Sequence, residues 1–193
     1  MRLTAENKQK ITARIRTGAA QVFREQGFAA VNLDALMKQA GLTRGAFYAH
    51  YRSKSALLSD VLRHEHPLLR MLEARDGTTG PELSAQMAAI FAHYLEPKNL
   101  SEVFAGCTLA ALTGDATRAD AHAKAAYGAA FEAICQEMAR GQEHRADAYA
   151  PPLVLASGAV RTAQAVGDDA LRENILRGAR QAFASLLPQE QEG

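Results

Sequence analysis

Apolar residues recur along this chain every three or four positions, which is the spacing of helices that bury one face. This pattern predicts an all-α protein of about nine helices. Thr4 is expected to cap the first helix, which runs to about Gln26 and stops at Gly27. Later helices are expected at about 54–75, 81–95, 101–117, 119–140, 151–166 and 168–187. Their expected start signals are Ser53, Pro81, Ser101, Pro151 and Asp168.

The segment NLDALMKQAGLTRGAFYAHY, residues 32–51, has the pattern of two short helices joined by a tight turn. Asn32 can accept hydrogen bonds from the first free N–H groups of one helix, and Gly41 can adopt the left-handed conformation that ends it. Thr43 can cap the second helix, whose inward residues are expected to be Phe47 and Tyr51. A short turn with glycine between two helices is typical of the helix-turn-helix, in which the second helix enters the DNA major groove.

The charge distribution agrees with a DNA-binding head. Residues 1–55 carry ten Lys and Arg against three Asp and Glu, a net charge of +7, although the whole chain has a net charge of only +1. The remaining residues have a net charge of −6. A basic head on an acidic body indicates that the head binds a polyanion. On the first helix, Lys8, Lys10, Arg14 and Arg16 are expected to be available to phosphates.

Other features argue against enzymes, metal proteins and membrane proteins. The two cysteines, Cys107 and Cys135, form neither a disulfide framework nor a paired metal motif, which fits a reducing cytosol. The histidines lack ligand-spaced partners, and phosphate-loop, nucleophile-elbow and zinc-protease motifs are absent. No apolar run reaches the roughly 18 residues of a membrane span. We therefore expect a cytoplasmic protein that is not an enzyme and has no cofactor or metal.

Four segments together resemble the tetracycline-repressor (TetR) family of bacterial transcriptional regulators. They are AAQVFREQGF at 19–28, LDAL and AGLTRGAFYAHY in the two-helix motif, and YRSKSALL at 51–58. The resemblance covers about the first 60 residues. Two departures, Leu33 after the cap and the Leu36-Met37 pair in the first motif helix, each keep an apolar residue where the family has one.

The resemblance implies a homodimer of nine or ten helices. Residues 1–52 would form a three-helix DNA-binding domain with its motif at 32–51, 53–75 a connecting helix, and 76–193 a ligand-binding and dimerisation domain. The last two helices resemble the family's dimerising pair, although their apolar stripes also fit packing within one subunit. Those stripes contain Leu153, Leu155, Ala159, Ala163 and Val166 on one helix and Leu171, Ile175, Ala179, Ala182, Phe183 and Leu186 on the other.

Residue chemistry and position in the family pattern predict how the head contacts DNA. The hydroxyl of Thr43 can donate to a phosphate, the guanidinium of Arg44 can bind a guanine or a phosphate, and Gly45 allows the backbone to come close to a base. Tyr48 resembles the family's phosphate-binding tyrosine, and His50 and Lys54 resemble its other backbone contacts. The expected DNA-binding residues are Asn32, Thr43, Arg44, Gly45, Tyr48, His50 and Lys54.

In this family the body usually holds a small molecule whose binding separates the two heads. The candidate lining residues are Met87, Phe91, Tyr94, Phe104, Cys107, Tyr127 and Phe131, although their helical spacing also fits plain core packing. The segment AGCTLAALTGD around Cys107 resembles a branch of the family in which a cysteine of this helix senses oxidants or electrophiles. The alternative is a buried packing residue, since no basic residue lies within one helical turn of Cys107.

These patterns predict a ligand-responsive DNA-binding regulator, most simply a repressor that binds an inverted-repeat operator as a homodimer and is released by a small-molecule inducer. Activation is also compatible with the sequence. A redox-sensing variant that uses Cys107 is one alternative. The other is a helical small-molecule-binding protein without DNA function.

Overall fold

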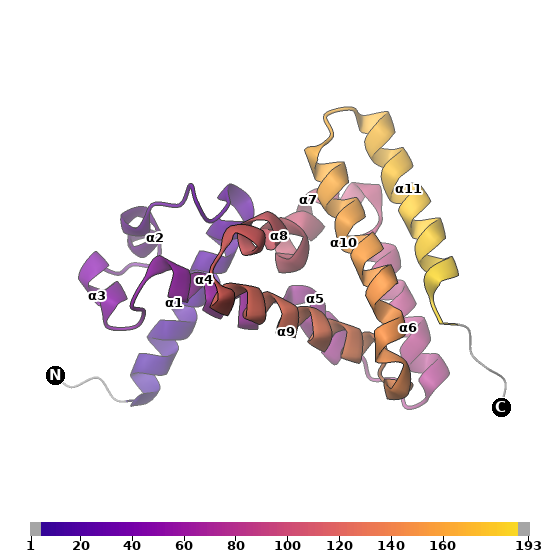
Figure 1. Cartoon of the computed structure of the whole chain (residues 1–193), viewed down its shortest axis with the longest axis horizontal. Helices are drawn as coiled ribbons and strands as arrows, with labels where there is room; N and C mark the ends of the chain where they lie inside the picture. The colour runs from indigo at the N-terminus through magenta and orange to yellow at the C-terminus, as the bar shows by residue number, and fades with distance from the viewer. Residues whose placement is uncertain (1–4, 189–193) are drawn as a thin grey trace. The chain divides into compact units, whose positions relative to one another are not determined.

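The computed structural model describes residues 5–188, apart from the side chains of Gln39, Phe104, Ala105, Glu143 and His144. Every regular element in this range is a helix, so the all-α prediction is confirmed. The predicted cap Thr4 lies outside the described residues. In order, the helices are α1 (Ala5–Gln26), α2 (Leu33–Gln39), α3 (Arg44–Tyr48), α4 (Lys54–His64), α5 (Pro67–Glu73), α6 (Gly80–Tyr94), η1 (Pro97–Asn99), α7 (Leu100–Gly106), α8 (Thr108–Arg118), α9 (Ala121–Met138), η2 (Glu143–Tyr149), α10 (Ala150–Ala165) and α11 (Asp169–Leu186), as Figure 1 shows.

The chain folds into two compact units. The head unit comprises the chain up to His66 together with Ala111–Ala130, and the body unit comprises Pro67–Ala110 and the chain from Phe131 onward. Helices α8 and α9 therefore each contribute residues to both units. The functional division into 1–52, 53–75 and 76–193 stays a prediction, because a packing unit and a functional domain are different divisions of a chain.

The core of the head unit joins α1, the two motif helices and α4. Phe23 of α1, Phe47 of α3 and Leu58 of α4 are fully buried in it. Leu112 of α8 and Ala126 of α9 belong to the same core. The motif helices are too short to be stable alone, since isolated helices below about 12 residues are marginal in water. Their conformation therefore depends on this shared core.

The predicted continuous helix over 54–75 is wrong. Helix α4 ends at His64, Glu65 has the non-helical angles φ −104 and ψ 69, and α5 begins at Pro67. Proline lacks the N–H that would continue the helix, and it disfavours helical angles in the residue before it. The connection after the head therefore consists of two helices with a break at residues 65–66.

The predicted helix over 101–117 is also interrupted. The 3-10 helix η1 leads into α7, which begins at Leu100, so the predicted cap at Ser101 is wrong. A second break falls at Cys107, after Gly106 has ended α7. Glycine weakens a helix because it loses the most backbone entropy on folding. Cys107 therefore precedes the first turn of α8.

Helices α10 and α11 form the most extensive helix pair of the body unit and run side by side (Figure 1). The predicted start signals are confirmed here: Pro151 lies in the first turn of α10, and the Asp168 carboxylate accepts a hydrogen bond from Leu171 N at 2.7 Å. Pro81 likewise lies in the first turn of α6, where Thr79 and Glu82 form a capping box. Over the described part of the chain, the helices are too short or too polar to cross a membrane.

Candidate nucleic-acid interface

The first motif helix, α2, begins where the sequence predicts. The side chain of Asn32 accepts a hydrogen bond from Asp34 N at 2.8 Å, which satisfies one of the free N–H groups at the helix start. Leu36 and Met37 point into the head core, where both are buried. The departure from the family pattern at this pair therefore preserves the packing surface of the helix.

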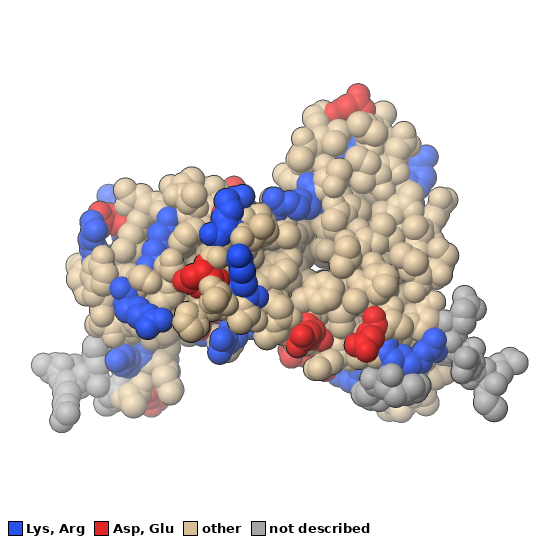
Figure 2. Space-filling model, viewed as in Figure 1, with Lys and Arg blue, Asp and Glu red and all other residues tan. Residues whose placement is uncertain are grey.

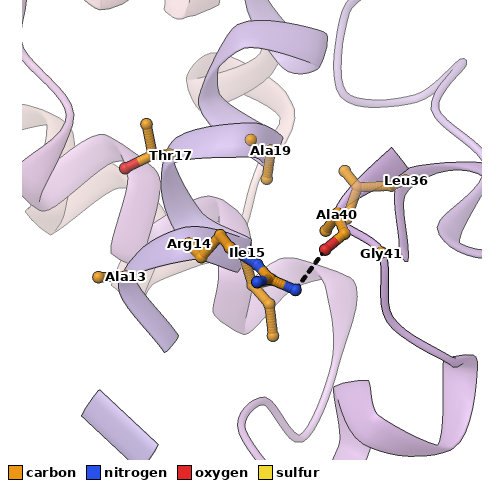
Figure 3. A pocket seen from close by; sticks show the side chains of 9 residues that line it. Ala13, Arg14, Ile15, Thr17, Ala19, Leu36, Ala40 and Gly41 are labelled. Carbon is orange, nitrogen blue, oxygen red and sulfur yellow. Dashed lines mark hydrogen bonds between the residues drawn. The ribbon is translucent and has the colours of Figure 1, made fainter. Parts of the chain in front are cut away.

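The turn after α2 is a Schellman motif. Gly41 has a φ of +66°, its N–H donates to Lys38 O at 3.0 Å, and Leu42 N donates to Met37 O at 2.8 Å. A guanidinium from α1 also reaches this turn, since Arg14 Nη2 donates to Ala40 O at 2.6 Å (Figure 3). Arg14 thereby fixes the C-terminal end of α2 against α1, beside a shallow hollow that the two helices line.

The second motif helix, α3, starts at a side-chain cap. Thr43 Oγ1 accepts a hydrogen bond from Ala46 N at 3.2 Å. Phe47 is fully buried and stacks on the ring of Tyr51, whose hydroxyl donates to Asp60 Oδ2 at 2.6 Å. The prediction that Phe47 and Tyr51 belong to the core is therefore confirmed. Their burial turns the opposite side of α3 outward.

The outward side of α3 carries four of the predicted DNA contacts. Thr43, Arg44, Gly45 and Tyr48 are all exposed, and Tyr48 is the most exposed aromatic residue described, with 56% of its surface accessible. The Tyr48 hydroxyl and the Asp34 carboxylate both raise the pKa of Arg44. Arg44 is therefore a permanently charged group at the start of the candidate recognition helix.

Asp34 is a functional candidate that the sequence reasoning missed. Its Oδ2 atom lies 3.0 Å from Arg44 Nη1, so an ion pair joins the exposed starts of α2 and α3. The two residues are ten positions apart and belong to different helices. Only the geometry of the turn brings them together, and no local sequence signal marks the pair.

His50 follows α3 and is tied to α1. Its Nδ1 atom lies 2.8 Å from the hydroxyl of Thr12, and the ring is partly buried. Burial and, secondarily, the charge of Lys8 lower the pKa of His50. The imidazole of the free protein is therefore neutral at neutral pH.

Lys54, in the first turn of α4, has partners of its own in the head. Its ammonium lies 4.5 Å from the centre of the Phe28 ring and donates to Ala29 O at 3.5 Å. Burial lowers the pKa of Lys54, while the charge of Asp115 acts in the opposite direction. Ser53 caps α4 as predicted, since its hydroxyl accepts from Ala56 N at 3.0 Å.

The basic residues of α1 divide into two groups. Lys8 and Lys10 are exposed, although Lys10 forms an ion pair with Glu6 at 2.7 Å. Arg16 is held inside the head by Glu65, whose Oε1 accepts from its Nε at 2.8 Å. The expectation that all four basic residues of this face are available to phosphates therefore fails for Arg16. Figure 2 shows blue Lys and Arg side chains over the visible face of the head unit.

The predicted ligand-lining residues do not form one cavity. Tyr94 and Cys107 line a hollow of about 150 Å³ in the body unit, together with Met71 and Ile90. Met87 and Phe91 are buried in the core, where Phe91 stacks on Phe183 with ring centres 4.5 Å apart. The side chain of Phe104 lies outside the described residues. Phe131 lines a separate hollow with Cys135, and Tyr127 belongs to the head unit, where its hydroxyl lies 3.1 Å from that of Thr113.

Cys107 occupies the position just before α8 and is 3% exposed. Its Sγ atom accepts hydrogen bonds from the Tyr94 hydroxyl at 2.8 Å and from Ala110 N at 3.4 Å. Arg161 of α10 donates to the backbone of the first turn of α8, at Ala110 O, over 2.9 Å. Among the side chains that the structure describes, no three His, Cys, Asp or Glu residues gather closely enough to hold a metal ion.

The last two helices expose an apolar surface. Leu153 and Ala163 are fully buried, so these members of the predicted stripes pack within the subunit. Other members border an open hollow between α10 and α11, together with Val154, Gly158 and Gly178; they are Leu155, Ala159, Ile175, Ala179 and Ala182. Val154 is 57% exposed, which is unusual for a large aliphatic residue.

Two sequence similarities to known proteins agree with this arrangement. Residues 15–61 match the sequence model of a family described as bacterial regulatory proteins, tetR family. The chain is 40% identical over 68 residues to the HTH-type transcriptional regulator SrpR of Pseudomonas putida, a match that covers 35% of this chain and 32% of SrpR. The chain therefore matches only about a third of the length of this curated relative.

Two solved structures have the same fold over nearly the whole chain. Escherichia coli NemR in its reduced form aligns with a TM-score of 0.68 at 16% identity, covering 91% of this chain and 96% of NemR. A TetR-family transcriptional regulator from Agrobacterium tumefaciens aligns with a TM-score of 0.65 at 16% identity, covering 91% and 98% of the two chains. At these identities the likeness concerns the fold alone.

Proposed function

We propose that the chain is a regulator of the tetR family that binds an inverted-repeat DNA operator as a homodimer and represses transcription there, which the match of residues 15–61 to that family supports. A small-molecule inducer bound in the body unit releases the operator. The single observation that carries the DNA-binding part is the exposed side of α3, which presents Thr43, Arg44 and Tyr48 from a helix anchored by the buried Phe47.

The proposed contacts divide into phosphate and base contacts. Thr43 and Tyr48 donate their hydroxyls to phosphates, and Lys54 supplies a positive charge beside them. Arg44 reads a guanine through O6 and N7, which accept the two parallel N–H groups of a guanidinium. Gly45 lets the backbone approach, and Asn32 and His50 contact the phosphates that flank the recognition helix.

The small size of α3, which has only five residues, supports the proposed dimer. One such helix reaches few base pairs, whereas two copies read half-sites about 34 Å apart on one side of the DNA. The open apolar surface of α10 and α11, with Val154 at its exposed edge, supports the proposal that this pair forms the dimer interface. Burying such a surface removes apolar area from water, which is the main driving force for association.

Selection of bound sequences from a random DNA pool, followed by affinity measurement, tests this function. Lys54→Ala and Tyr48→Ala are expected to weaken binding to every sequence, and Lys54→Ala also flattens the dependence of log affinity on log salt by about 0.9. The matched control is Lys98→Ala, which removes an equal charge from an exposed residue of the body unit. If salt-dependent DNA binding is absent, the chain is instead a helical small-molecule-binding protein.

The selected sequences also test the assembly and the direction of regulation. An inverted repeat is expected, and a single unrepeated site would contradict the dimer. A reporter gene downstream of the selected site is expected to be silenced by the protein. Increased expression would identify an activator.

A second candidate function, redox sensing by Cys107, is favoured by one specific observation. The Cys107 sulfur accepts hydrogen bonds from Tyr94 and Ala110, and both donors stabilise negative charge on sulfur at the start of α8. A hollow of about 150 Å³ suits a small oxidant better than a drug-sized ligand. In this reaction the thiolate attacks a peroxide, an S–O bond forms as the O–O bond breaks, and the departing oxygen leaves as water once protonated.

Mass spectrometry after mild peroxide treatment tests this candidate. Cys107 is expected to gain one oxygen atom, with loss of operator binding. Cys135 is the internal control, because burial raises the pKa of its thiol to about 11 and it should remain unmodified. An unmodified Cys107 with unchanged operator binding would leave it as a packing residue.

A further inference from the structure

The ion pair between Asp34 and Arg44 joins two side chains whose positions are fixed by their own helices. Asp34 lies in the first turn of α2, which Asn32 caps, and Arg44 is the first residue of α3, which Thr43 caps. The side chains are 56% and 60% exposed, and Asp34 Oδ2 lies 3.0 Å from Arg44 Nη1. The pair is therefore presented to solvent on the same surface as the candidate DNA contacts.

A carboxylate on this surface contributes little to folding stability and lowers the affinity for DNA. Exposed ion pairs contribute little to folding, because water screens the attraction and two long side chains lose freedom. A negative charge also repels the DNA phosphates. Residues 1–55 contain only two other acidic residues, Glu6 and Glu25, and both lie on α1. Asp34 is thus the single acidic side chain of the two-helix motif.

We propose that Asp34 is a specificity-determining positioning residue, whose carboxylate holds the Arg44 guanidinium toward a guanine edge and away from the neighbouring phosphates. This inference rests on the proposed docking of α3 into the major groove. Arginine has five N–H donors in a planar fork, and Asp34 occupies Nη1. The remaining donors still include two parallel N–H groups that match guanine O6 and N7.

Without Asp34, the negative phosphates would attract the Arg44 guanidinium away from the guanine edge. A mobile guanidinium near DNA binds the closest phosphate, and such a contact carries no sequence information. The repulsion between Asp34 and the phosphates makes that alternative unfavourable, whereas the guanine edge has no negative charge of its own. When the interface excludes water, the lower dielectric strengthens both the ion pair and the repulsion. Asp34 therefore lowers overall affinity but raises the difference between correct and incorrect sites.

The test compares two readouts for each variant on the selected operator. One is affinity for unrelated DNA, and the other is the loss of affinity when the guanine assigned to Arg44 is replaced. That guanine is the position at which Arg44→Ala loses discrimination. Asp34→Ala is expected to bind unrelated DNA several-fold more tightly, with a salt dependence steeper by about 0.9. Its discrimination at the assigned guanine is expected to fall about tenfold, within the range of one bidentate contact.

Conservative variants and a double mutant show whether Asp34 acts through Arg44. Asp34→Glu, which keeps the charge, is expected to restore most of the discrimination, whereas Asp34→Asn, which keeps the shape, is not. In an Arg44→Ala background, Asp34→Ala is expected to cause no further loss at the assigned guanine. If Asp34→Ala lowers the midpoint of thermal unfolding, the comparison of Asp34→Glu with Asp34→Asn still shows whether the charge of Asp34 determines discrimination at the assigned guanine.

Three results would overturn the inference. Asp34→Ala could keep full discrimination, Asp34→Asn could behave like the wild type, or the loss at the guanine could persist without Arg44. The third result would mean that Asp34 contacts a base itself, for example the amino group of a cytosine. A failure of the proposed function is distinguishable from all three, because the wild-type protein would then show no salt-dependent DNA binding.

Discussion

The hydroxyl of Thr12 contacts both Lys8 O, at 2.9 Å, and His50 Nδ1, at 2.8 Å. Because a carbonyl oxygen can only accept, both contacts are hydrogen bonds at once only in the tautomer whose Nδ1 carries the proton. In the neutral ring the other nitrogen, Nε2, then carries a lone pair and cannot donate to a phosphate. His50 can therefore bind a DNA phosphate through Nε2 only after it takes up a second proton.

Operator binding is accordingly expected to be coupled to proton uptake. Burial and the charge of Lys8 lower the pKa of His50 in the free protein, and a bound phosphate raises it. The contact between His50 and the phosphate therefore contributes its full binding free energy at pH values below the pKa of His50 in the free protein. This contribution is lost as the pH rises through the pKa of His50 in the DNA complex. Affinity measured from about pH 8 down to about pH 5 is expected to increase several-fold.

The matched variant for this prediction is His50→Gln, which keeps a polar side chain that does not titrate. It is expected to remove the His50 part of the pH dependence, measured as the difference from the wild type. The same pH profile in both proteins would contradict the assignment.

Two tyrosine hydroxyls in the head are expected to have opposite roles. Tyr51→Phe removes the part-buried hydrogen bond of 2.6 Å to Asp60 and is expected to cost about 1–2 kcal/mol in the free energy of unfolding. Tyr48→Phe removes an exposed hydroxyl and is expected to leave stability unchanged while operator affinity falls. Urea unfolding and DNA titration of both variants check this, and equal stability of the two variants would contradict the structural role of Tyr51.

Local chemistry was sufficient to predict the framework of the head. Asn32, Thr43 and Ser53 each cap the helix that follows, and Gly41 has the positive φ that ends α2. Each of these interactions involves residues within four positions of one another, so the sequence carries the whole signal. The burial of Phe47 likewise follows from helical spacing.

Partners that are distant in sequence were not predictable. Asp34 and Arg44 meet because of the angle between two helices, and Thr12 meets His50 across 38 positions. The hydrogen bond from the Tyr94 hydroxyl to the Cys107 sulfur was missed for the same reason, since the two residues lie 13 positions apart. The predicted DNA and ligand contacts themselves stay predictions. Side-chain chemistry indicates what each residue can bind. The hydrogen bonds and ion pairs of that residue in the free protein indicate which interactions the binding of DNA or ligand must break.

The turn of the helix-turn-helix is expected to be sensitive to a single methyl group. Gly41→Ala forces a residue with a Cβ atom into a φ of +66°, which costs about 1–2 kcal/mol of stability and loosens α3. Gly18→Ala is the matched control: Gly18 lies within α1, a Cβ there meets nothing within 4 Å, and helix propensity favours alanine by up to about 1 kcal/mol. Thermal unfolding should move in opposite directions for the two variants. A stabilising Gly41→Ala would show that the turn has a different conformation.

A buried guanidinium is expected to govern the stability of the body unit. Arg75 is 8% exposed and donates to Leu72 O at 2.9 Å, to Leu83 O at 2.8 Å and to Glu137 O, and thereby joins the backbones of α5, α6 and α9. Lysine has the same charge but a compact ammonium that cannot reach three separated carbonyls, so Arg75→Lys should cost about 2–4 kcal/mol in urea unfolding. The control, Arg177→Lys on the exposed side of α11, is expected to change stability by less than about 0.5 kcal/mol. Equal effects of the two substitutions would mean that the carbonyls around Arg75 find water or other donors, and that charge alone matters at this position.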